Sequence, residues 1–520
     1  MSGWAKTPMD RNQVLLFNPT LDATISENHP VRLYDEILRS CDWSAWESQY
    51  VLVVGQPPIH PRVVASVILY GLNQGIRSSR VLERQCRNSL DYLWLANGHE
   101  LDHTTICKFR TRFRKELKSL FRQLGRIALD MGFACLNTVG LDGTQIRANS
   151  SRQGTVGAET IAKQMAELDE QIERILAEAE QADARDAKLF GEDSPNQLPS
   201  ELADLSKRQA KLSQVMAAIK KKESADKPNN SKKVKVPLAD PESRILPNKE
   251  GGFAPNYTTI ATTESRNGFI MDAEVILEGG EGDQTVKSMD RIEDNFAKMP
   301  DRLLADTNFG RGQTFAQLEE RNVEAYIPVH RHSHSTENPA EREELSTPVP
   351  EADRAKLPRN ASTKKLDRSA FVYDESADCY YCPMGQPLSF AGLHTKPRKD
   401  GPAQYRMYRG ANCLHCELSG ECLAGQSKQR TIYRDKYEKS REAMDARMNS
   451  PIGQKIYQQR QWLAETPFAI IKACLKLRQF LLRGIEKVRA EWLWTCTTFN
   501  LAKLVRCLAQ LRAERAATEA

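Results

Sequence analysis

The sequence lacks any long apolar run. No stretch of about 18 apolar residues occurs, and the N-terminus MSGWAKTPMDRNQ has no apolar signal-peptide region. We therefore expect no membrane-spanning helix and a soluble, cytoplasmic protein. The chain also lacks a Walker pattern, and the short glycine-containing runs at Gly279 and Gly310 are too brief to cradle a phosphate, so no nucleotide cofactor is expected.

The sequence has no strong overall charge of either sign. Its 520 residues carry a net charge of +6, with 40% hydrophobic and 27% charged residues, which is typical of globular proteins. A chain of this length exceeds what one hydrophobic core usually serves, so we expect two to four domains. The basic residues are clustered, and such clustering favours a polyanionic partner.

Cysteine is sparse outside one window. Of 12 cysteines, seven are scattered in apolar stretches, as buried reduced thiols usually are. A tight cluster in a cytosolic chain favours a metal over disulfides, and two CxxC pairs are typical of a zinc ribbon. A small apolar knot of reduced thiols is the alternative. The window contains five candidates: Cys379, Cys382, Cys413, Cys416 and Cys422.

Residues 1–130 have the pattern of a helical domain. Asp102 can cap a helix that begins at His103, and this helix carries basic residues around an apolar side. A short helix, a turn and a basic second helix are the parts of a helix-turn-helix that binds a DNA groove. An ordinary helical bundle with a solvated basic face is the alternative. The candidates for DNA contact are Lys108, Arg110, Arg112 and Arg114.

An insert with a helical pattern separates two strand-rich segments. Apolar residues step by four and three from Ile161 to Ile175, and the same stepping returns from Leu205 to Ile219. This heptad pattern predicts an antiparallel coiled-coil hairpin, followed by a basic linker rich in proline and asparagine. Dimerisation, a grip on DNA and an ordered spur all remain open as its role.

Three carboxylates occupy special places in the expected elements. We predict a strand that leads to Asp142 and then turns, a short strand that ends at Asp306, and a helix beside Glu465. Strand ends that face a helix form the usual crevice of a sheet-based site, where three carboxylates can hold two magnesium ions about 3.5–4 Å apart. Spacing alone does not select these three among 68 acidic residues, and a Glu465 that merely faces water is the alternative.

Four blocks resemble the DDE transposases of bacterial insertion sequences. They are RNQVLLFNPTLDATISENHPVR through LDHTTICKFRTRFR, LDGTQIRANSSR around Asp142, LLADTNFGRGQTFAQLEERNVEAYIPV around Asp306, and AETPFAIIKACLKLRQF around Glu465. With its inserts, the chain is most similar to the subgroup called the IS-eleven-eighty-two family. The resemblance implies an RNase H-like core in which Asp142, Asp306 and Glu465 are the catalytic ligands of two Mg²⁺ or Mn²⁺ ions.

The resemblance also implies an activity and partners. Metal-activated water would hydrolyse a phosphodiester at each transposon end, and the freed 3′-hydroxyl would attack target DNA, both by in-line phosphoryl transfer. Synapsis of two DNA ends implies a homodimer or a larger assembly, located at the bacterial nucleoid. A DNA-binding regulator without catalysis and a nuclease that cuts without joining are the competing interpretations.

The resemblance further assigns DNA-contacting and zinc-binding residues. Related transposases carry a tyrosine, an arginine, the glutamate and a lysine on one helix, with three residues between arginine and glutamate. Here four residues separate the arginine from the glutamate. Pro467 predicts either a new helix with Thr466 as its cap and Pro467 in its first turn, or a kink in one long helix. The matching residues are Tyr457, Arg460, Glu465 and Lys472. For structural zinc the resemblance selects Cys382, Cys413, Cys416 and Cys422, with Cys379 as the alternate.

Together these patterns predict a multidomain α/β protein. A helical DNA-binding domain (1–130) precedes an RNase H-like, mixed-sheet catalytic core (131–154 and 236–330) that C-terminal helices (431–520) complete. A coiled-coil hairpin with its basic linker (155–235) and a polar, cysteine-rich, zinc-like segment (331–430) interrupt that core.

Overall fold

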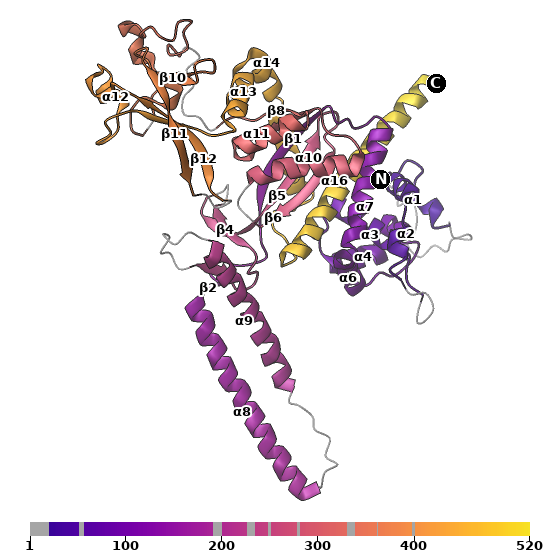
Figure 1. The fold of residues 1–520 in the computed structure, drawn as a ribbon. Helices are drawn as coiled ribbons and strands as arrows, with labels where there is room; N and C mark the ends of the chain where they lie inside the picture. The colour runs from indigo at the N-terminus through magenta and orange to yellow at the C-terminus, as the bar shows by residue number, and fades with distance from the viewer. Residues whose placement is uncertain are drawn as a thin grey trace, which may run out of the picture. The chain divides into compact units, whose positions relative to one another are not determined.

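The structure is a computed structural model (Figure 1). It describes residues 20–50, 57–190, 200–225, 234–247, 251–277, 281–329, 338–360, 362–397 and 401–519. Contacts divide the chain into two compact units. The first comprises Met1–Gly279, Ser288–Pro300 and Arg460–Ala520, and the second comprises Gly280–Lys287 and Asp301–Gln459.

Helices open the first unit. The predicted cap at Asp102 is confirmed, because its carboxylate accepts the backbone N–H groups of Thr104 and Thr105 at 2.7 and 3.0 Å. Trp46 is fully buried and stacks on Phe113 with ring centroids 5.1 Å apart. The helices are α1 (Pro30–Ser40), α2 (Ser44–Glu47), α3 (Pro61–Asn73), α4 (Ser79–Asn88), α5 (Leu90–Leu95), α6 (His103–Arg112) and α7 (Arg114–Asp130).

The C-terminal helix α16 (Ile485–Glu519) joins these helices to a sheet. It packs on α1, α3, α6 and α7 and also on strand β6 (Ile270–Ile276). Trp494 lies edge-on to Trp46 at 6.2 Å, and Trp492 donates its indole N–H to the carbonyl of Ile260 at 3.3 Å. The helical region is therefore continuous with the sheet, across the boundary that the sequence placed near residue 130.

The sheet of the first unit centres on β5 (Phe253–Glu264). β5 pairs antiparallel with β1 (Thr138–Arg147), β4 (Arg244–Pro247) and β6. Asp142 lies near the middle of β1, opposite Ala261, so the expected turn after Asp142 is wrong. The strand continues because Gly143–Arg147 keep their partners on β5, where the β-branched Thr144 and Ile146 suit an extended backbone.

A helical hairpin projects from the same unit (Figure 1). β2 (Thr155–Gly157) pairs antiparallel with β3 (Lys235–Pro237), and α8 (Ala158–Phe190) contacts α9 (Ser200–Ala225). Residues 191–199, which connect the two helices in sequence, and most of the basic linker lie outside the described residues. The coiled-coil geometry stays a prediction. The buried residues of the hairpin are Ile161, Leu168, Leu212, Val215, Ile219 and Val236.

The second unit combines a small parallel strand pair with an antiparallel sheet. β7 (Arg302–Ala305) pairs parallel with β8 (Glu324–Tyr326), and α11 (Gly312–Glu320) connects them. Helix α10 (Gln284–Phe296) contributes residues to both units. The antiparallel sheet has the order β13-β12-β11-β10-β9. Its elements are β9 (Val372–Asp374), β10 (Cys379–Tyr381), β11 (Pro387–Lys396), β12 (Ala403–Gly410) and β13 (Thr431–Arg434), with α12 (Ser419–Cys422) nearby in the sequence.

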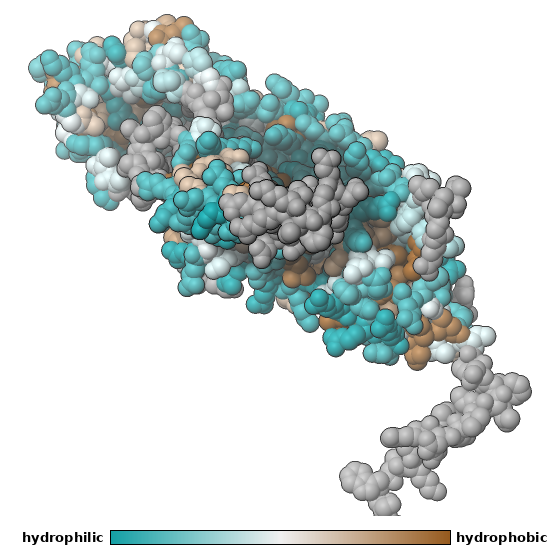
Figure 2. Space-filling model, turned by 90° about the horizontal axis from the view of Figure 1, so that it is seen from below, coloured by the Kyte–Doolittle hydropathy of each residue, from teal (hydrophilic) through white to brown (hydrophobic). Residues whose placement is uncertain are grey.

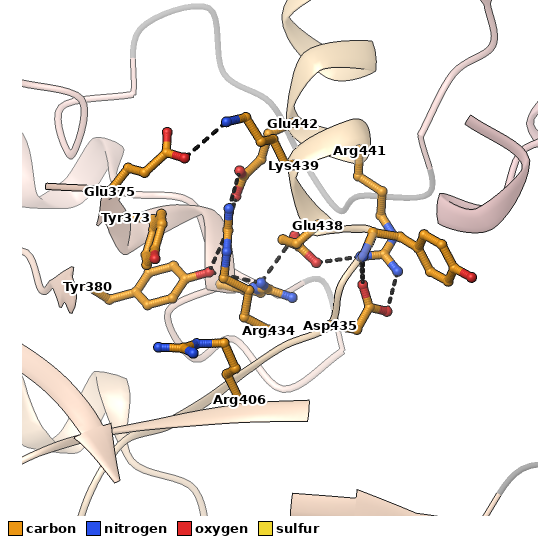
Figure 3. Close-up of polar contacts among 12 residues, drawn as sticks. Tyr373, Glu375, Tyr380, Arg406, Arg434, Asp435, Glu438, Lys439, Arg441 and Glu442 are labelled. Atoms are coloured by element: carbon orange, nitrogen blue, oxygen red, sulfur yellow. Dashed lines mark hydrogen bonds and ion pairs between the residues drawn. The ribbon is translucent and has the colours of Figure 1, made fainter. Parts of the chain in front are cut away.

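Ion pairs tie this antiparallel sheet to α13 (Glu438–Asn449), which precedes α14 (Pro451–Tyr457). Arg434, at the end of β13, donates to both carboxylate oxygens of Glu442 at 2.6 and 2.9 Å (Figure 3). The Glu438 side chain is only 2% exposed and pairs with Arg441 of the same helix and with Arg368, just before β9, at 3.1 Å. Because a buried carboxylate is stable only with such partners, the network fixes α13 on the cysteine-rich sheet.

The face in Figure 2 is mostly hydrophilic, with hydrophobic residues in separate patches. Among the described helices, none is both long and apolar enough to cross a membrane.

Candidate functional site

One face of β1 carries Asp142. Gly140 and Thr144 share that face, because side chains alternate along a strand. A π-helical turn (Gln461–Glu465) packs on it through Leu463, which is 1% exposed. A Cβ at Gly140 would lie 2.8 Å from Leu463 Cγ, so glycine allows the turn to lie directly on the strand.

The π-helical turn accommodates the extra residue between Arg460 and Glu465. A π turn closes over one residue more than an α turn, so these two residues lie one turn apart despite the four that separate them. Pro467 lacks the N–H that an α-helix would use to bond Leu463. The next helix, α15 (Thr466–Ala473), begins at Thr466 with Pro467 in its first turn. Glu465 and Thr466 both have helical backbone angles (φ −89°, ψ −34° and φ −57°, ψ −43°), so α15 continues directly from the π-helical turn. The predicted alternative of a new helix capped by Thr466 is therefore wrong.

Arg460 lies between two carboxylates. Its Nη2 is 3.4 Å from Oδ1 of Asp142, and its Nη1 is 4.0 Å from Oε1 of Glu465. The Arg460 and Asp142 side chains are each 16% exposed, whereas that of Glu465 is 56% exposed. The resemblance implied a DNA contact for Arg460. The structure instead places it on the two predicted catalytic residues of this unit.

Lys472 reaches the same face of β1. Its Nζ donates to Oγ1 of Thr144 at 2.6 Å, two residues beyond Asp142. Thr144 was not among the residues that the sequence motifs identified. The period-two alternation of β1 would have identified it, because every second residue after Asp142 faces the same way.

Asp306 and Tyr457 lie in the second unit. Asp306 follows β7 directly, as predicted, and its carboxylate accepts the backbone N–H of Thr307 at the start of a short 3₁₀ turn. The Tyr457 hydroxyl donates to the carbonyl of Ala305 at 3.4 Å. Within this unit, the structure therefore brings Tyr457 to the residue that precedes Asp306.

The carboxylate pair has the donor chemistry of a magnesium site. Mg²⁺ prefers hard carboxylate oxygens and retains several waters, and Asp142 and Glu465 already share one cation in the guanidinium of Arg460. No shared site of three or more His, Cys, Asp or Glu residues is preformed within the described ranges. The carboxylate oxygens of the pair have the chemistry that a divalent cation requires, and a metal site built from them stays a prediction.

The four basic residues predicted to contact DNA from α6 and its end differ in orientation. Lys108 and Arg112 are exposed, and Arg114 pairs with Glu486. Arg110 instead points inward. Its Nη1 donates to the Arg77 carbonyl at 2.7 Å, and burial lowers its pKa.

The inward direction of Arg110 disagrees with the predicted DNA contact. Arg110 lies four residues after the buried Ile106 and beside the buried Phe109, so it belongs to the apolar stripe of α6. That spacing was visible in the sequence.

Four cysteines line one cavity of about 40 Å³ in the second unit. They are the four that the resemblance selected, Cys382, Cys413, Cys416 and Cys422, and Cys379 is not among the lining residues. The backbone N–H of Arg430 donates to Sγ of Cys413 at 3.4 Å. Burial is the main reason that the pKa of Cys422 is raised to about 11 and that of Cys382 is also raised. Both thiols are therefore protonated near neutral pH.

Two family models match the chain. Residues 381–505 match the model described as Transposase DDE domain, a range that includes Arg460, Glu465, Lys472 and the four cavity cysteines. Residues 19–112 match the model described as Transposase domain (DUF772). Comparison with curated proteins and with solved structures gave no match. A transposase DDE domain implies a metal-dependent enzyme that cleaves DNA, and the two matches support an insertion-sequence transposase of the DDE type.

Proposed function

We propose that the protein binds the ends of an insertion sequence, cleaves DNA phosphodiesters there, and joins the freed 3′-hydroxyl strand to target DNA. Asp142, Asp306 and Glu465 are the proposed ligands of two Mg²⁺ or Mn²⁺ ions. The observation that carries the proposal is the meeting of Asp142 and Glu465, from distant parts of the sequence, around one cation. The long inserts favour the IS-eleven-eighty-two subgroup.

Each residue of the first unit has a distinct part in this proposal. When bound, the metal pair would activate the attacking oxygen and stabilise the leaving one. Asp142 lies in the middle of the paired strand β1, so the backbone that carries its carboxylate is held in place. Glu465 is half exposed and can turn toward a ligand. Lys472, held by Thr144, offers a positive charge to a DNA phosphate at the same face.

The cysteine cavity is the proposed structural zinc site. Four thiolates satisfy tetrahedral zinc and leave no position open for water, so the role is structural. The cavity supports the choice of Cys382, Cys413, Cys416 and Cys422 over Cys379. Gly410 leaves room for Cys413, because a Cβ there would lie 2.8 Å from Sγ of Cys413 and would displace that sulfur.

Cleavage and joining of end DNA test the proposal. The full-length protein, Asp142→Asn, Asp306→Asn and Glu465→Gln would each be mixed with duplexes that carry the DNA flanking the gene, with and without Mg²⁺. Glu514→Gln, in the exposed last turns of α16, is the matched control. We expect every variant to bind the duplex, and only the wild type and Glu514→Gln to cut it. Removal of one charged group that stabilises the transition state should slow cutting at least about 100-fold.

Other outcomes would favour the competing interpretations. If all proteins bind the duplex and none cuts it in Mg²⁺ or Mn²⁺, the chain is a regulator without catalysis. If the wild type cuts but yields no joined product with target DNA, it is a nuclease. If the three carboxylate variants cut as fast as Glu514→Gln, these residues are not the metal ligands.

A further inference from the structure

The position of Arg460 has a consequence for metal binding that goes beyond the proposed chemistry. Its guanidinium contacts one oxygen of Asp142 and one of Glu465, at 3.4 and 4.0 Å. A divalent cation held by these two residues would use oxygens of the same two carboxylates. Arg460 and such an ion are therefore alternatives for at least part of this space.

The local backbone makes this arrangement possible. In an α-helix, residues five apart point in directions about 140° from each other, because each residue turns the helix by about 100°. The π-helical turn removes that offset, so that Arg460 and Glu465 face the same side. Leu463 anchors the turn on Gly140 of β1, and the turn therefore delivers Arg460 to Asp142 as well.

We infer that Arg460 is a built-in counter-cation. It holds Asp142 and Glu465 together in the metal-free protein, and it must leave them when a divalent ion enters. This inference rests on the proposed metal role of the two carboxylates. Arg460 is a positioning residue, because it acts through the two carboxylates.

Charge and burial both favour this role. Asp142 is largely buried in the first unit, and a desolvated carboxylate near a second one is unstable without a cation. The long Arg460 distances indicate a loose ion pair that a dication with direct oxygen coordination can displace.

The inference predicts a measurable effect on metal affinity. Removing Arg460 removes a competitor and a repelling charge, so the pair should bind a divalent ion more tightly. A charge within about 4–6 Å changes the proton affinity of a carboxyl group by at least about tenfold, and we expect a change of that size for a divalent ion. The Arg460→Met variant keeps a long apolar stem for packing and loses only the guanidinium.

Mn²⁺ titration of the full-length, metal-free protein tests this without DNA and without turnover. Four variants are compared with the wild type by calorimetry, and free Mn²⁺ is followed by its electron paramagnetic resonance signal. Arg460→Met should bind Mn²⁺ at least about tenfold more tightly than the wild type, and Arg460→Lys should lie between them. Arg80→Met, an exposed arginine on α4, should bind as the wild type does, and Asp142→Asn should lose the site.

The outcomes separate this inference from the proposed function. If Asp142→Asn weakens Mn²⁺ binding but Arg460→Met binds equally or more weakly than the wild type, the counter-cation role is wrong and the metal site stands. If Asp142→Asn and the wild type bind Mn²⁺ alike, both ideas fail. Should Arg460→Met not fold, Arg460→Lys decides, because an unchanged affinity there refutes a role for the guanidinium.

Discussion

Replacing Gly140 by alanine inserts a methyl group between β1 and the π-helical turn. The added Cβ would lie 2.8 Å from Leu463 Cγ, 3.0 Å from Cδ2 and 3.2 Å from Cβ. Carbon atoms in favourable contact are about 3.5–4.0 Å apart, so Leu463 must retreat by up to about 1 Å. Because Leu463 lies within the turn, its retreat also moves Arg460 and Glu465 away from Asp142.

The expected loss of stability follows from two opposed effects. Overpacking of a buried contact costs about 1–3 kcal/mol. The lower entropy of the unfolded chain with alanine returns about 0.4–1 kcal/mol. We therefore expect Gly140→Ala to lower the free energy of unfolding of the first unit by about 1–2 kcal/mol. Leu463→Ala alone should cost about 2–5 kcal/mol, because the residue is fully buried.

A double-mutant cycle provides the assay. Urea unfolding followed by tryptophan fluorescence would compare Gly140→Ala, Leu463→Ala and the double variant, with Gly154→Ala as the control. A Cβ at Gly154 meets its nearest neighbour at 3.7 Å, an ordinary contact, so that variant should lose no stability and should gain about 0.4–1 kcal/mol, which alanine provides through the unfolded chain. In the double variant the new methyl occupies space that Leu463 vacates, so its loss should fall short of the sum by about 1–2 kcal/mol. Additivity within about 0.5 kcal/mol would refute the packing argument.

Further predictions concern the cap, the cysteine cavity and its pH dependence. Asp102→Ala should destabilise the helical region by about 1 kcal/mol, since the N-terminal amides of α6 lose their acceptor; an unchanged denaturation midpoint would contradict this. Cys413→Ser and Cys416→Ser should lower both bound zinc and folded yield, whereas Cys379→Ser should retain wild-type zinc by atomic absorption. Zinc affinity should rise as the pH increases from 6 to 8, because zinc binding must expel protons from thiols whose pKa values burial has raised, to about 11 for Cys422. Calorimetry in two buffers of different ionisation enthalpy measures those protons, and their absence would exclude thiolate ligation.

Local signals in the sequence predicted several parts of the fold correctly. The Asp102 cap and the strand before Asp306 depend on neighbours within a few residues, so the pattern was sufficient. The helices of the 155–235 insert also formed where the heptad stepping indicated. In α9 the stepping from Leu205 to Ile219 includes Gln209 and omits Val215. The structure shows the reverse for burial, since Val215 is buried in the core of the hairpin and the Gln209 side chain donates to Asp169 at 2.6 Å.

Non-local packing decided the features that the sequence missed. Asp142 stays within a strand because β5 pairs with the residues after it, and no local rule reports such a partner. The π-helical turn depends on Leu463 meeting Gly140 across the fold. Arg110 was predicted to contact DNA because it is charged. Its position in the helix, on the buried stripe of α6, was not considered.

The candidate site was predictable in its residues more than in its geometry. The resemblance to transposases selected Asp142, Arg460, Glu465 and Lys472, and the structure brings all four to one face of β1. The resemblance did not predict that the Arg460 guanidinium lies between the two carboxylates, because the extra residue before Glu465 changes the helical spacing. The four cavity cysteines were also selected by resemblance, since the spacing of the two CxxC pairs favoured Cys379 over Cys422.

Metal-directed cleavage of the protein backbone tests the central claim most directly. Fe²⁺ substitutes for Mg²⁺ in many oxygen-ligand sites, and with peroxide and ascorbate it generates radicals that cut the chain beside the bound ion. We expect cuts near residues 142, 306 and 465 together, which excess Mg²⁺ suppresses and Asp142→Asn abolishes. Cuts that omit the neighbourhood of Asp306, or that persist in Asp142→Asn, would contradict a single metal site built from these three carboxylates.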